Sequence, residues 1–156
     1  MNDNKMDCPS TPTLYPLPRI RDQRGNLSFL QDFDQLPFAI ERCYWLYDVP
    51  GDANRDGHAY YRSQEVIIAL SGSFDVTVDI GDGTPAQRFN LNRSYNALYV
   101  PAMCWREIDN FSTNSVALVI SSTIFDEADY IRDYRQFLNL RGCLKINENT
   151  RWRIFC

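Results

Sequence analysis

Alternation of apolar and polar side chains from Phe74 to Ile80 constrains the fold of this chain more than any other stretch. The run reads Phe-Asp-Val-Thr-Val-Asp-Ile. In an extended strand successive side chains point to opposite faces, so one face of this run is apolar and the other is largely polar. Gly81-Asp82-Gly83 follows with residues suited to a hairpin turn. The stretch therefore predicts a half-buried strand that leads through a tight turn into a second strand.

Short segments that favour strands recur along most of the chain. They are rich in β-branched and aromatic residues and are bounded by turn-forming residues. Many short strands at regular spacing indicate an all-β sandwich or barrel rather than β-α-β units. The segments lie at residues 27–30, 40–47, 65–70, 87–91, 97–100, 106–109 and 116–121.

The two ends of the chain differ from this central part. Four of the eight prolines lie within residues 9–18, which predicts an extended arm. Near the other end Asp126 is suited to cap a helix, and an aromatic stripe of Tyr130, Tyr134 and Phe137 at helical spacing would pack on the barrel. The expected division is an N-terminal arm at residues 1–19, one domain with its C-terminal helix at residues 20–138 and a C-terminal extension at residues 139–156.

The composition argues against several classes of function. A net charge of −4 provides no overall basic character for binding nucleic acid. No apolar run approaches the roughly 20 residues that cross a membrane as a helix, and residues 1–10 lack the apolar core of a signal peptide. The five cysteines include no Cys-x-x-Cys pair. We therefore expect a cytoplasmic protein without nucleic-acid or membrane partners.

The single histidine of the chain, His58, lies in an extended run together with Tyr60. Residues two apart on a strand share a face, so both side chains would point into whatever the sheet encloses. In the segment 40–47 the same rule places Arg42 and Tyr44 on one face. Because both faces of that segment mix polar and apolar residues, we expect one face to line a cavity.

These residues resemble a known family. The matching runs resemble the two cupin motifs and, more narrowly, the dTDP-4-keto-6-deoxyhexose 3,4-ketoisomerases of the WxcM-like group. The resemblance implies an all-β fold, a cupin jelly-roll barrel with one C-terminal helix, and a homodimer that isomerises a dTDP-linked 4-keto-6-deoxy sugar. The runs include His58-x-Tyr60-x4-Glu65-x6-Gly72, Pro101-x4-Arg106-x3-Asn110, Asp22-x-Arg24-Gly25-Asn26-Leu27, Arg42-x-Tyr44, Arg55-x-x-His58-Ala59 and Phe125-Asp126-Glu127-x-Asp129-Tyr130-Ile131-Arg132.

A metal site would use the four positions at which many cupins hold a divalent cation. In this chain those positions carry His58, Tyr60, Glu65 and Arg106. A guanidinium group is always charged and repels a cation where a ligand is needed. One imidazole and one carboxylate do not make a sound site for zinc, iron or manganese. We therefore predict neither a metal nor another cofactor.

Ketoisomerisation instead requires a base that removes the C3 proton, a stabilised enediol and an acid that returns a proton at C4. Histidine titrates near neutral pH, so His58 is the best candidate base. Tyr60 is the second catalytic candidate, as a proton donor to the sugar oxygens. A phenol is a poor base unless a nearby cation lowers its pKa. Arg106 is a candidate for that cation and for stabilising an enediolate.

The remaining candidates concern substrate binding. Arg24, Arg42 and Arg55 match arginine positions of the family, and guanidinium suits bidentate contacts to a diphosphate. Tyr44 is expected to stack on thymine or ribose. Glu65 is expected to orient His58 or an arginine.

Two alternatives stay open at this level. The family commonly has histidines at the positions of Tyr60 and Arg106, so a cupin that binds a nucleotide sugar without converting it is one alternative. A cupin sugar epimerase is the other, because those enzymes use a histidine and a tyrosine.

Overall fold

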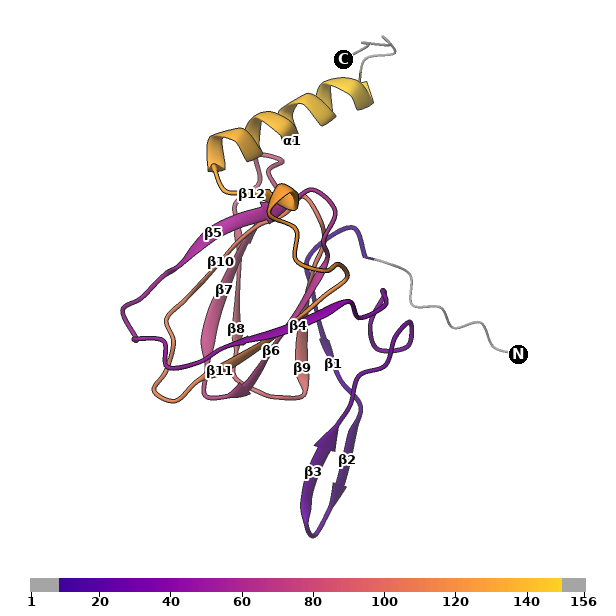
Figure 1. Ribbon diagram of the computed structural model, residues 1–156, viewed down its shortest axis with the longest axis vertical. Helices are drawn as coiled ribbons and strands as arrows, with labels where there is room; N and C mark the ends of the chain where they lie inside the picture. Colours follow the sequence, from indigo (N-terminus) through magenta and orange to yellow (C-terminus); the bar gives the residue numbers. More distant parts are fainter. Residues whose placement is uncertain (1–8, 150–156) are drawn as a thin grey trace, which may run out of the picture.

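The computed structural model describes residues 9–149 as an antiparallel β structure with one long helix (Figure 1). Two five-stranded sheets pack face to face as the predicted jelly-roll barrel. The first contains, in spatial order, β1 (Thr13–Pro16), β9 (Asn96–Val100), β6 (Glu65–Ser71), β11 (Val116–Ser121) and β4 (Arg42–Leu46). The second contains β12 (Tyr130–Ile131), β5 (Arg55–Tyr60), β10 (Trp105–Asp109), β7 (Phe74–Asp79) and β8 (Gln87–Leu91).

The alternation that predicted β7 is confirmed by its burial. Phe74, Val76 and Val78 are almost fully buried within the core between the two sheets. β7 and β8 form the predicted hairpin, and Gly81 and Gly83 in the turn have φ values of 69° and 85°, a region that favours glycine. Between the sheets, apolar side chains of both strand sets exclude water and hold the barrel together.

β6 is buried on both faces, which explains why its sequence is a continuous apolar run rather than an alternating one. Ile67 and Ala69 face the core between the sheets. Val66 and Ile68 face outward, into a second apolar cluster that the segment before β4 covers with Leu36 and other residues.

The described N-terminal residues include strands within and just after the predicted arm. β1 pairs antiparallel with β9 at the edge of the first sheet. An edge position tolerates Pro16, which has no N–H to donate. β2 (Arg19–Asp22) and β3 (Gly25–Ser28) follow as a two-stranded hairpin that stands away from the barrel (Figure 1). Residues 1–8 of the arm lie outside the described residues.

The C-terminal helix α1 spans Tyr134–Asn149, so the prediction of a helix that begins at Asp126 is wrong in its start. Asp126 instead caps the short 3-10 turn η1 (Glu127–Asp129). The Asp129 carboxylate accepts hydrogen bonds from the backbone N–H groups of Arg62 and Ser63. These tertiary bonds bring the next two residues alongside β5 as β12, and they override the local helical periodicity.

The helix also continues beyond residue 138, across the start of the predicted C-terminal extension, whose residues 150–156 lie outside the described residues. Phe137 anchors the helix in a small apolar cluster with Ala59, Trp105 and Ile131. The Phe137 ring centroid lies 5.9 Å from that of Trp105. The predicted packing of the aromatic stripe on the barrel is therefore confirmed for Phe137.

We predict that Phe137→Ala lowers the free energy of unfolding by about 3–5 kcal/mol, because it leaves a cavity where a fully buried ring had packed. Leu138→Ala on the same helix is the matched control, since Leu138 is 39% exposed, and a change below about 1 kcal/mol is expected for it. Urea denaturation of the full chain measures both. Equal losses in the two variants would show that Phe137 is not the anchor.

Candidate active site

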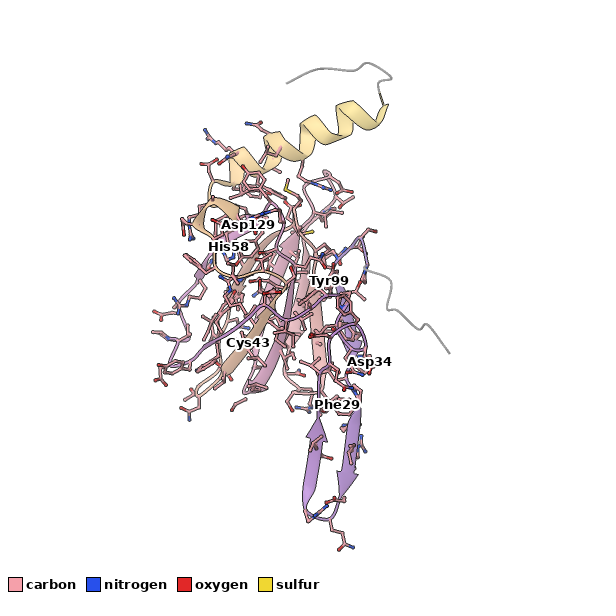
Figure 2. All side chains as sticks on the ribbon, turned by 45° about the vertical axis from the view of Figure 1, so that its right-hand side comes forward. Phe29, Asp34, Cys43, His58, Tyr99 and Asp129 are labelled. Carbon is pink, nitrogen blue, oxygen red and sulfur yellow. The ribbon has the colours of Figure 1, made fainter. Side chains whose placement is uncertain are left out.

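A cavity of about 540 Å³ opens between β4, at the edge of the first sheet, and the β5–β12 edge of the second sheet. Figure 2 shows His58 and Asp129 at the end of the barrel beside α1. The lining includes four arginines and one histidine. The lining residues are Arg42, Tyr44, Leu46, Asn54, Arg55, His58, Arg106, Phe125, Tyr130 and Arg132.

A buried ion pair between Glu65 and Arg106 lies at the floor of this cavity. Glu65 is 1% exposed and Arg106 is 4% exposed. The Arg106 Nε and Nη2 atoms lie 2.9 and 2.8 Å from Glu65 Oε2. The other carboxylate oxygen, Oε1, accepts hydrogen bonds from the hydroxyls of Tyr44 at 2.7 Å and Tyr60 at 3.0 Å. Both oxygens of Glu65 are therefore satisfied by protein donors.

Both members of the pair remain ionised. Burial alone would raise the pKa of Glu65, but the charge of Arg106, the nearby His58 and the hydrogen bonds it accepts outweigh burial and hold that pKa below its usual range. Burial opposes the charge of Arg106 as well, yet the Glu65 carboxylate raises the Arg106 pKa. Each charge thus compensates the desolvation of the other.

The surroundings of Tyr60 disfavour its phenolate form. Burial raises its pKa, and the negative charge of Glu65 raises it further, whereas Arg106 lowers it by less. The expected lowering of the Tyr60 pKa by Arg106 is thus present but is outweighed by burial and by Glu65, with which Arg106 is paired. Tyr44 responds in the same way, and its pKa is also raised, chiefly by burial. Both phenols remain neutral hydrogen-bond donors.

His58 lies on β5 and projects with Tyr60 from one face, which confirms the sequence prediction for this pair. Their ring centroids lie 4.9 Å apart, edge to face. His58 is 9% exposed and lines the cavity, whereas Tyr60 lies behind the lining residues and is 5% exposed. On the neighbouring strand β10, Arg106 pairs with His58 across the sheet. The imidazole is therefore placed to face a bound molecule.

The structure brings most of the predicted binding residues together but leaves Arg24 apart. Arg42 and Tyr44 from β4, and Arg55 from β5, line the cavity. Arg24 lies at the turn of the β2–β3 hairpin, where its side chain is 90% exposed and pairs with Asp22 at 2.6 Å. The hairpin points away from the end of the barrel that holds His58 (Figures 1 and 2). Arg24 does not line the cavity of its own chain.

The segment around η1 contributes three lining residues that were not among the sequence candidates. Phe125 is 60% exposed and lies at the Arg42 guanidinium, 5.6 Å from ring centroid to Cζ. Tyr130 and Arg132 follow on and after β12. Arg132 lies 4.3 Å over the Tyr130 ring and is held by two hydrogen bonds to Glu127. Tyr130 and Arg132 are two residues apart, so on a strand they would share one face. This spacing could have identified them, but the segment was interpreted as a helix.

Among the residues whose side chains the structure describes, no group of three histidine, cysteine or acidic side chains is placed to hold a metal ion. No helix among these residues is long and apolar enough to span a membrane. At the positions where cupin metals are held, the ion pair of Glu65 and Arg106 instead forms a closed hydrogen-bonded unit with two phenols. The donor set does not suit a divalent cation, and the absence of a metal cofactor stays a prediction.

Comparisons with known proteins converge on one family. The chain matches the family model FdtA, described as WxcM-like, C-terminal, over residues 10–142. It is 36% identical over 119 residues to the TDP-4-oxo-6-deoxy-α-D-glucose-3,4-oxoisomerase of Aneurinibacillus thermoaerophilus, which covers 76% of this chain and 84% of that protein.

Solved structures agree with this match. The TDP-quinovose 3,4-ketoisomerase WlaRB of Campylobacter jejuni is 35% identical, with a TM-score of 0.79 over 83% of this chain and 98% of that chain. A histidine-to-asparagine mutant of the 3,4-ketoisomerase QdtA of Thermoanaerobacterium thermosaccharolyticum, in complex with TDP-4-keto-6-deoxyglucose, is 29% identical. Its TM-score is 0.80, over 85% of this chain and 95% of that chain.

We predict that Glu65→Gln lowers the free energy of unfolding at pH 7 by about 3–5 kcal/mol, because it leaves the Arg106 charge buried without its partner. The matched control is Glu127→Gln in the exposed pair with Arg132, for which little change is expected. Urea denaturation compares the two variants. Equal effects would contradict a special role for the buried pair.

The pH dependence of this loss has a defined sign. The pKa of Glu65 is lowered in the folded state from 4.5, so its charge stabilises the fold above that value. This contribution is lost as the pH falls through the lower folded-state pKa. The difference between wild type and Glu65→Gln should therefore shrink below about pH 4.5.

Proposed function

The chain belongs to the FdtA family of WxcM-like C-terminal domains, and on this basis we propose that it isomerises a TDP-linked 4-keto-6-deoxyhexose to its 3-keto form. The observation that carries the proposal is one cavity in which an imidazole, His58, lies among four arginines. Guanidinium groups suit a diphosphate, and histidine suits proton abstraction near neutral pH. A bound TDP-4-keto-6-deoxyglucose in the related QdtA structure supports this class of substrate.

His58 is the proposed base that removes the proton from C3. The electrons of the broken C3–H bond move toward the C4 carbonyl, and its oxygen gains negative charge as the enediolate forms. Arg106 is already balanced by Glu65, so the nearby Arg42 is better placed to supply net positive charge. His58 then returns the proton at C4, which completes the transfer between adjacent carbons.

The diphosphate is assigned to the arginines nearer the mouth of the cavity. Arg55 and Arg132 line the cavity and are more exposed than Arg106, so their guanidinium groups are available to phosphate oxygens. The Tyr44 hydroxyl donates to Glu65, and its partly buried ring packs against the core cluster. The exposed ring of Phe125 is therefore the better candidate to stack on thymine.

We predict that His58→Asn reduces conversion of TDP-4-keto-6-deoxyglucose by about 100-fold or more, because the base is lost. Proton NMR in deuterated buffer follows formation of the 3-keto sugar and deuterium at the exchanging carbon. Titration calorimetry with TDP is the control for an intact pocket, and its affinity should change little. A His58→Asn protein as active as wild type would refute the assignment.

The same experiment separates the alternative functions. Saturable binding of the sugar nucleotide by the wild type without turnover would indicate a binding module. Exchange or inversion at C5 would indicate an epimerase. Either result would overturn the proposed isomerase activity.

We further propose that two copies associate and that Arg24 of each reaches the cavity of the other. Arg24 and the exposed apolar residues Ile20 and Leu27 lie on the hairpin that stands away from its own barrel. An arm of this kind buries its apolar side chains only against another surface. Because Arg24 does not line the cavity of its own chain, its contact to substrate requires the homodimer.

We predict that Arg24→Ala raises KM several-fold without changing the sedimentation coefficient, because one phosphate contact is lost. Arg93→Ala, an exposed arginine outside the cavity, is the control. Mixed dimers of Arg24→Ala and His58→Asn subunits should recover a low KM, since the Arg24→Ala subunit would receive Arg24 from its partner. Sedimentation as a monomer, or no recovery in mixed dimers, would contradict the proposal.

A further inference from the structure

Tyr130 occupies a position in the cavity wall that the proposed reaction has not yet used. It lies on β12 directly opposite Tyr60 of β5. Its ring centroid is 4.6 Å from that of Tyr60 and 5.1 Å from that of His58. Asp129 holds the start of this short strand through its two bonds to backbone N–H groups of the loop after β5. Tyr130 is therefore fixed beside the proposed base.

The Tyr130 ring packs against Tyr60, which connects the cavity wall to the buried ion pair. Tyr60 in turn donates its hydroxyl proton to Glu65. Because this bond fixes the Tyr60 ring, the neighbouring Tyr130 ring is held in its place in the cavity wall.

The reaction requires two separate proton movements, and His58 accounts for one of them. Moving the carbonyl from C4 to C3 breaks the C3–H bond and forms a C4–H bond. It also breaks the O3–H bond and forms an O4–H bond. No net oxidant, reductant or extra proton is needed, because each proton lost at one atom is gained at its neighbour. The second movement needs a group that can donate to O4 and accept from O3.

A neutral phenol satisfies this requirement although it is a poor base. It gives its own proton to one oxygen as it takes the proton of the other, so it never becomes a phenolate. Tyr60 lies behind the cavity wall, whereas Tyr44 and Tyr130 line it. The Tyr44 hydroxyl already donates to Glu65 and accepts from Arg106, so Tyr130 is the phenol better placed to reach the sugar oxygens.

We propose that the Tyr130 hydroxyl is a catalytic group that carries the proton between O3 and O4 of the sugar, and that Tyr60 is the positioning residue that orients it. The inference rests on the proposed isomerase function. It assigns the carbon-bound proton to His58 and the oxygen-bound proton to Tyr130. The two neighbouring side chains thereby divide the reaction between them.

Tyr130→Phe tests this assignment because it removes the hydroxyl and keeps the ring that Arg132 and Phe125 contact. We expect conversion of TDP-4-keto-6-deoxyglucose to fall by about 100-fold, with KM and the affinity for TDP changed less than about threefold. Tyr61→Phe is the matched control: Tyr61 is 39% exposed, and its hydroxyl accepts a bond from Gln136 outside the cavity. It should retain wild-type conversion.

Deuterium exchange distinguishes a proton relay from a structural role. Tyr130→Phe should lower the rate of hydrogen exchange at C3 at least tenfold less than it lowers the rate of conversion, since His58 still removes the carbon-bound proton. NMR of substrate recovered from deuterated buffer measures this exchange. Equal losses of exchange and conversion would overturn the proposal. Conversion within twofold of wild type would also overturn it.

Tyr60→Phe supplies a second measurement. If Tyr60 acts through Tyr130, the double variant Tyr60→Phe/Tyr130→Phe should convert substrate less than twofold more slowly than Tyr130→Phe alone. If the losses of the two single variants instead multiply in the double variant, the positioning role is overturned. Thermal unfolding confirms that each variant is folded. Wild-type protein in the same assay separates the two proposals. Absence of conversion by the wild type would refute the isomerase function. Conversion by both the wild type and Tyr130→Phe would refute only the proton transfer by Tyr130.

Discussion

The ion pair of Glu65 and Arg106 is the interaction on which the rest of the site depends. It joins β6 of one sheet to β10 of the other and places two full charges where both residues are at most 4% exposed. Such a pair is stable only when its geometry is good and its remaining donors and acceptors are satisfied. The hydroxyls of Tyr44 and Tyr60 provide that satisfaction. The pair therefore fixes both phenols, and Tyr60 in turn lies against His58.

The position of the cavity follows from how the two sheets end. β4 and β12 are edge strands of different sheets, so the barrel is open between them and polar side chains face the gap. Asp129 closes one side of this opening by holding β12 against β5. Its carboxylate is thus part of what places Tyr130 and Arg132 in the wall. Catalytic and binding groups on strands are held more rigidly than groups on free loops.

Most of the fold could be predicted from local patterns, because strand alternation reports burial directly. β7 alternates since one face meets the core, and β6 is continuously apolar since Leu36 and its neighbours cover its outer face. The start of α1 could not be predicted this way. Tyr130 and Tyr134 have helical spacing, but the bonds from Asp129 to a loop more than 60 residues earlier decide the conformation of Tyr130, and local spacing carries no information about such bonds.

The sequence by itself determined the all-β class, most strands of the barrel, the shared face of His58 and Tyr60, and the resemblance that named the family. These features depend on residue type and on spacing along one strand. Only the tertiary structure decided how the charges pair. Arg106 is neutralised by Glu65, so it does not activate Tyr60, and Arg24 stands far from its own cavity on an exposed hairpin. The physical reason is that pKa values and binding geometry depend on distances and burial between strands, which residue order along the chain does not specify.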